Sequence, residues 1–112
     1  MAKLQPTIAA AVATKGRAAD LNRLLKSLAD QTYPVSSILI IDQNPDNRLV
    51  DIIAAFPALP IQHHRTPELV GVCRNRNFGW QQAQQDIIIF PDDDCWYPAD
   101  FMAKAVDLFA QT

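Results

Sequence analysis

The chain has 112 residues, of which 49% are hydrophobic and 20% charged, and its formal net charge is −2. That length suits one domain with a single core, and the composition excludes a disordered or collagen-like chain. The small net charge and the scattered basic residues argue against nucleic acid as a partner. We therefore expect one globular domain spanning residues 1–112.

Apolar and amphipathic stretches alternate through the first half of the chain. Residues 7–13 are apolar throughout, as in a strand covered on both faces. Leucines three and four residues apart then predict an amphipathic helix, which ends before Pro34. A second apolar run, 38–41, stops at Asp42, and a short helix at 49–56 and a third strand at 61–64 follow.

The second half continues the same alternation. Residues 72–85 predict a helix, 87–90 predict a buried strand, and Asp92 to Asp94 follow directly. Pro98 suits the first turn of a last helix, whose expected apolar face consists of Phe101, Ala105, Leu108 and Phe109. Strands that alternate with helices indicate an α/β fold with a mostly parallel sheet and right-handed crossovers.

Polar residues interrupt the apolar runs at the ends of three of these strands. Residues 14–17 follow the first strand, Asp42 ends the second, and Asp92 to Asp94 follow the fourth. Ligands of open parallel sheets bind beyond the carboxyl ends of the strands, so these residues are expected to converge into one site.

The acidic triplet has two possible readings. Adjacent ionised carboxylates repel one another, and a hard cation such as Mg²⁺ or Mn²⁺ would compensate them. They could equally form a solvated turn that caps the following helix. With three glycines the chain contains neither a Walker A sequence nor G-x-G-x-x-G, so a bound nucleotide would need another device.

Four segments resemble the N-terminal half of family 2 glycosyltransferases. They are Val12 to Arg17 with the leucine helix and Gln31-Thr32-Tyr33-Pro34, then Ile40-Ile41-Asp42, then Gly71 to Gly79, similar to G-x-x-x-A-R-N-x-G, and finally Phe90 to Asp94, similar to F-L-D-x-D-D. The resemblance covers almost the whole chain, in the family's order and spacing. It implies the N-terminal half of a GT-A fold, a Rossmann-like three-layer sandwich with strand order 3-2-1-4.

The same resemblance implies roles for individual residues. Thr14 and Arg17 would line the nucleotide pocket, Asp42 would read the base, usually uracil, and Arg76 would lie near the nucleotide. Asp92 and Asp94 would form the D-x-D pair that contacts ribose and holds Mn²⁺ or Mg²⁺ on the diphosphate, and Asp93 between them would also bind the nucleotide sugar. The chain departs from the family pattern at Gln43, Asn75 and Cys95, which bears on the choice of base and sugar.

The implied reaction is transfer of a sugar from a nucleoside diphosphate donor, most often a UDP-sugar, to a glycan, lipid or other hydroxyl acceptor, with inversion. Inversion needs a general base, which the family supplies C-terminal to the D-x-D strand and thus beyond residue 112. We therefore assign no catalytic residue and expect a fragment that binds donor without transferring sugar. A sugar-phosphate nucleotidyltransferase and a non-catalytic binding or assembly module are the alternatives.

Four further expectations complete this reading. The adjacent pair His63 and His64 should point to opposite faces of a strand and not chelate one ion.

Strand order 3-2-1-4 leaves the strand at 87–90 as an edge through which isolated chains would self-associate. Two cysteines, Cys73 and Cys95, are typical of free thiols in a cytoplasmic protein. No run approaches the roughly 18 apolar residues of a membrane span, so any attachment of the full-length protein to a membrane would use another segment.

Overall fold

A computed structural model describes residues 6–65 and 85–110 of the chain. Its elements, in chain order, are β1 (Ile8–Thr14), α1 (Ala18–Ala29), β2 (Ser37–Asp42), α2 (Val50–Ala54), β3 (Ile61–Arg65), β4 (Ile87–Ile89) and α4 (Phe101–Ala110). The helix expected at residues 72–85 lies outside the described residues, as do Cys73, Asn75 and Arg76. All four expected strands are present, each within two residues of its expected ends.

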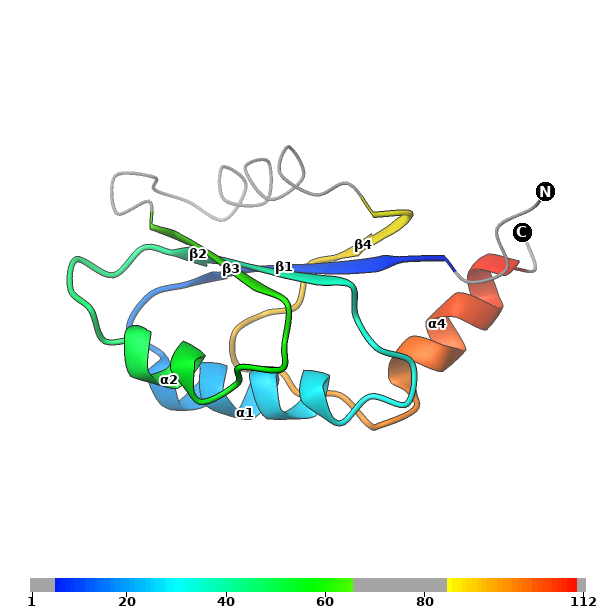
Figure 1. Cartoon of the computed structure of the whole chain (residues 1–112), viewed down its shortest axis with the longest axis horizontal. Coiled ribbons are helices and arrows are strands. Elements are labelled where there is room, and N and C mark those ends of the chain that lie inside the picture. The colour runs from blue at the N-terminus through cyan, green and yellow to red at the C-terminus, as the bar shows by residue number, and fades with distance from the viewer. Residues whose placement is uncertain (1–5, 66–84, 111–112) are drawn as a thin grey trace.

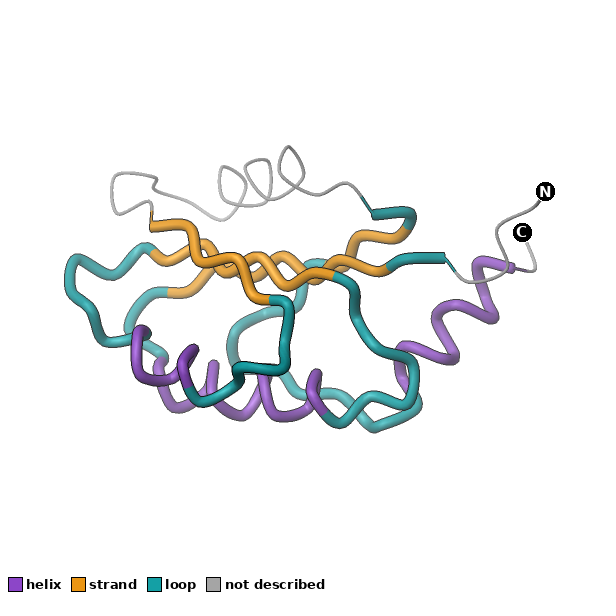
Figure 2. The backbone as a smooth tube through the Cα atoms, viewed as in Figure 1, coloured by secondary structure: helices purple, strands orange, loops and turns teal. Residues whose placement is uncertain are grey.

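The strands form one parallel sheet in the order β3-β2-β1-β4, which confirms the expected order. In the central pair Thr14 lies opposite Asp42, so the polar residues that end β1 and β2 meet at one edge. Figure 1 shows α1 and α2 packed along one face of this sheet. The tube in Figure 2 shows how the crossover loops carry the chain between sheet and helix layer.

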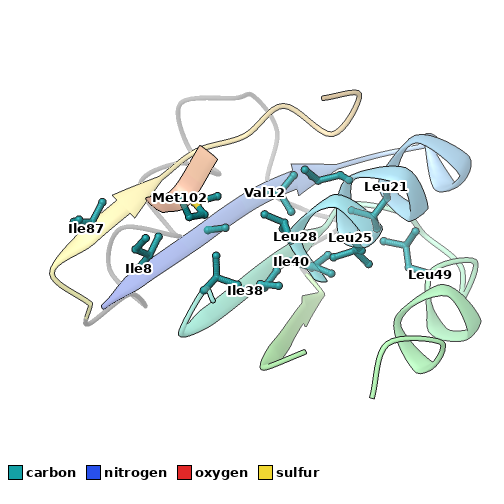
Figure 3. Close-up of a cluster of buried hydrophobic side chains, with 13 residues drawn as sticks. Ile8, Val12, Leu21, Leu25, Leu28, Ile38, Ile40, Leu49, Ile87 and Met102 are labelled. Carbon is teal, nitrogen blue, oxygen red and sulfur yellow. The ribbon is translucent and has the colours of Figure 1, made fainter. Parts of the chain in front are cut away.

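The main core lies between the sheet and α1 (Figure 3). The leucines of α1 that the spacing places on one face are at most 2% exposed. They pack against Val12 of β1 and Ile40 of β2, which are fully buried. Burial of a leucine side chain contributes about 1.5–3 kcal/mol. This packing fixes the sheet edge that carries the polar residues.

The last helix differs from its expected start and face. It begins at Phe101, and Pro98 precedes it, accepting a hydrogen bond from the Phe101 N–H at 3.1 Å. Met102 is fully buried, whereas Phe101 is 36% and Leu108 66% exposed. The expected apolar face is therefore wrong at Phe101 and Leu108, whereas Ala105 is partly buried and the side chain of Phe109 is not among those described. A tertiary contact orients the helix instead: the Met102 N–H donates to Oε1 of Gln31 at 3.0 Å. Among the described residues no helix is long and apolar enough to span a membrane.

Candidate functional site at the carboxyl edge of the sheet

The turn after β1 is held against the loop after β2. The Gln43 N–H donates to the carbonyl oxygen of Thr14 at 3.0 Å, which continues the β1–β2 pairing beyond the strands. Gly16 has a φ of 74°, a left-handed conformation that favours glycine, and its N–H donates to Oδ1 of Asn44 at 2.7 Å. These bonds hold Thr14 and Arg17 at the edge of the sheet where β1 and β2 end.

The acidic triplet lies in a turn after β4. We call residues 92–95 the acidic turn; the Cys95 N–H closes it by donating to the carbonyl oxygen of Asp92 at 3.1 Å. Its carboxylates differ in environment, since the side chain of Asp93 is 12% exposed and that of Asp94 is 51% exposed. Asp93 thus points toward the protein, and Asp94 toward solvent.

Arg17 connects the turn after β1 to the acidic turn. Its Nη1 lies 3.2 Å from Oδ2 of Asp94 and 3.5 Å from Oδ1 of Asp93. A second arginine, Arg23 of α1, donates from Nη2 to the backbone oxygen of Asp94 at 3.2 Å. Arginine is well suited to this place, because its planar guanidinium can contact carboxylate and phosphate oxygens alike.

Burial raises the pKa of Asp93 above its usual value, and the charges of Asp94 and Asp20 act in the same direction. The nearby Thr14 hydroxyl and the Arg17 guanidinium act in the opposite direction without cancelling the effect. The ionised form of Asp93 in the acidic turn is therefore destabilised, and a bound cation nearby would stabilise it.

A pocket of about 370 Å³ joins these elements. Its walls are formed by Ala11, Ala13, Thr14, Lys15, Arg17, Gln43, Phe90, Pro91, Asp92, Asp93 and Asp94. Five residues expected in the site thus line one cavity, and they come from segments that are distant in the sequence. Lys15, from the 14–17 segment expected at this edge, and Gln43 also line it, although neither was given a role of its own in the sequence analysis. The position of Gln43 directly after Asp42 at the end of β2 is the signal that could have assigned it to the site.

Asp42 is not on the pocket wall. It is fully buried, and its Oδ1 accepts hydrogen bonds from the backbone N–H and from Nδ2 of Asn44 at 2.8 and 2.9 Å. Its Oδ2 lies 2.8 Å from Nε2 of His63 and 3.9 Å from Nε of Arg65. The carboxylate is thus engaged within the protein, and its contact with a base stays a prediction. Arg76 lies outside the described residues.

Gln31, just after α1, attaches the segment that follows the acidic turn. Its Nε2 donates to the carbonyl oxygens of Pro98 and Ser27 at 2.7 and 3.1 Å, and its Oε1 accepts from Met102. The Thr32 N–H adds a bond to the carbonyl oxygen of Ala99 at 2.8 Å. Together with Arg23, these contacts hold both ends of the 94–102 segment against α1.

Three side chains of the acidic turn can reach one cation. One ligand atom each from Asp92, Asp94 and Cys95 can be chosen so that all lie within 4.8 Å of one another. Two carboxylates suit Mg²⁺ or Mn²⁺, which keep water and substrate phosphates as their other ligands. These metal-ligand side chains therefore fit a divalent cation at this edge of the pocket.

Comparison with known proteins agrees with this geometry. Residues 10–112 match the family model described as glycosyl transferase family 2. The chain belongs to glycosyl transferase family 2. The family segment includes all four strands except for the first two residues of β1, together with the whole acidic turn.

Solved structures that are similar to this family 2 chain include a mannosyltransferase and S. aureus TarS. The mannosyltransferase PcManGT from Pyrobaculum calidifontis, in complex with GDP-Man and Mn²⁺, has a TM-score of 0.85 at 22% identity over 95% of the chain and 33% of its own length. S. aureus TarS residues 1–349 in complex with UDP has a TM-score of 0.83 at 20% identity over 94% of the chain and 32% of its own. The same TarS fragment with UDP-GlcNAc has a TM-score of 0.81 at 20% identity over 94% and 31%.

At these identities the likeness shows the fold, which is that of the GT-A glycosyltransferases. The family 2 chain spans between about a fifth and a third of the length of the structures it resembles. No curated protein matches its sequence closely enough to count as a relative.

Proposed function

We propose that this chain is the donor-binding part of a glycosyltransferase. The enzyme would use a nucleoside diphosphate sugar, with a UDP-sugar as the preferred donor, and would transfer the sugar to an acceptor hydroxyl with inversion. The observation that carries the proposal is the pocket in which Thr14, Arg17 and the acidic turn meet at the carboxyl edge of the sheet. Membership in glycosyl transferase family 2 gives the reaction class.

Asp92 and Asp94 would hold the divalent cation, Mn²⁺ or Mg²⁺, and the ribose and diphosphate would lie between them and the turn after β1. When bound, the cation would stabilise negative charge on the departing nucleoside diphosphate. The guanidinium of Arg17 would add a second positive charge at this place, because its Nη1 lies 3.2 Å from Oδ2 of Asp94 before any donor binds.

The nucleoside would extend along the wall made by Lys15 and Gln43, beside the buried Asp42. A carboxamide both donates and accepts hydrogen bonds, so Gln43 suits the edge of a uracil as well as that of other bases. We assign no described residue to the general base that inversion requires.

Calorimetry with UDP and GDP, with and without Mn²⁺, tests the proposal. We expect UDP to bind in a Mn²⁺-dependent way and Asp94→Ala to weaken that binding at least about tenfold, because a charged metal ligand is lost. Asp100→Ala is the matched control, since that aspartate is exposed, pairs with Lys104 and does not line the pocket. A folded chain that binds neither nucleotide would leave a binding or assembly module as the better interpretation. UDP binding that is equally tight without metal would contradict the cation site.

A further inference from the structure

Cys95 brings sulfur into a site otherwise built from oxygen. It closes the acidic turn through its backbone N–H, is partly buried, and is a free cysteine. Its Sγ belongs to the same group of ligand atoms, all within 4.8 Å of one another, as a carboxylate oxygen of Asp92 and one of Asp94. Ligands of one cation lie at such separations, because metal–ligand bonds are roughly 2.0–2.4 Å long.

A second observation points to a ligand beside this group. Thr14, a residue that is 2% exposed, lines the same pocket as Asp92 and Asp94, and its hydroxyl oxygen is buried. Its approach to Asp93 lowers the pKa of that carboxyl, but among the described residues it makes no hydrogen bond of ordinary geometry. A buried hydroxyl in this state favours a polar ligand, such as a phosphate oxygen or a metal-bound water, in the pocket.

We propose that the Cys95 thiolate is a third protein ligand of the cation that Asp92 and Asp94 hold, and that it makes the site prefer borderline-soft ions such as Zn²⁺ and Co²⁺ over Mg²⁺. Thiolate ligands select such ions, whereas sites of carboxylate and water suit Mg²⁺. The thiol gives its proton to solvent when the metal–sulfur bond forms. The inference rests on the proposed function, because it concerns the same metal site.

Co²⁺ titration followed by absorption spectroscopy tests the ligand directly, with no need for activity. The chain has a second cysteine, so the experiment uses a Cys73→Ser background, compared with the same chain carrying Cys95→Ser as well. We expect a sulfur-to-cobalt charge-transfer band that disappears in Cys95→Ser and in Asp94→Ala. Serine keeps the size of the side chain and replaces soft sulfur by hard oxygen, so Co²⁺ should bind about tenfold more weakly while Mg²⁺ binding is retained.

Calorimetry with UDP on the same variants separates this inference from the proposed function. Metal-dependent UDP binding without a charge-transfer band would overturn the role of Cys95 and leave the proposed function standing. A charge-transfer band without any UDP binding would support the thiolate ligand and contradict the donor site. If Cys95→Ser binds Co²⁺ as tightly as the background chain does, the thiolate is not a ligand.

Discussion

The imidazole Nε2 of His63 lies 2.8 Å from Oδ2 of Asp42, whose side chain is completely buried. The pair links β3 to the end of β2, where the register also places Arg65 opposite Asp42. His63 is therefore engaged with a carboxylate next to Gln43, which lines the pocket. His63 and Asn44 both bind the carboxylate of Asp42, which does not line the pocket, whereas the neighbouring Gln43 does.

Asp42→Ala should lower the free energy of unfolding by about 2–4 kcal/mol, because buried donors lose their acceptor. Asp42→Asn should cost less, since its carboxamide oxygen can still accept from the N–H of Asn44. Urea unfolding monitored by circular dichroism measures both, with the exposed Asp100→Ala as the control. If Asp42→Ala unfolds at the control's midpoint, the carboxylate does not stabilise the fold.

Gln31→Leu should displace the acidic turn and lower the free energy of unfolding by about 1–3 kcal/mol, because the bonds to Pro98 and Met102 are lost together. Gln31→Glu keeps an acceptor for the Met102 N–H and should restore part of the loss. Amide chemical shifts of Asp92 to Cys95, measured by NMR, report the displacement separately from stability. Gln62→Leu, at an exposed position of β3, is the matched control; shifts as small as the control's would show that Gln31 does not position the turn.

The pKa of Asp46 is lowered to about 2, first by its side-chain hydrogen bonds from Arg48. Because the folded pKa lies below the ordinary 3.8, the pair's contribution to stability is present above that value and is lost as the pH falls through about 2. Arg48→Gln should return the pKa toward 3.8, as read from the carboxyl carbon shift of Asp46 during an NMR titration. Lys104→Gln, in a remote ion pair, should leave the titration unchanged; an Asp46 that titrates identically in Arg48→Gln would contradict the pairing.

Self-association through β4 remains a prediction. Within the described part of the chain β4 pairs with β1 alone and ends the sheet, so its outer backbone groups are available to another strand. Light scattering after gel filtration should show a mass that rises with concentration, and amide exchange of Ile87 to Ile89 should slow in parallel. The opposite edge strand, β3, carries Arg65 and serves as the internal control, since charge discourages edge pairing. A monomer at all concentrations would exclude the edge as an interface.

The strands and the edge of the sheet where the site lies could be predicted from the residue pattern alone. Unbroken apolar runs predicted strands buried on both faces, and the polar residues after them had to meet because parallel strands end at one edge. Thr14, Arg17 and the acidic turn therefore converge as expected.

Which polar side chains face the pocket depends on contacts between segments, and the residue pattern could not predict it. Asp42 and Gln43 are neighbours at the end of β2, yet Asp42 is bound by His63 and Asn44 while Gln43 lines the cavity. The face of α4 likewise follows Gln31 and not the spacing of its apolar residues, so Met102 is buried where Leu108 was expected. Periodicity describes one segment at a time, whereas these orientations depend on hydrogen bonds between segments that are distant in the sequence.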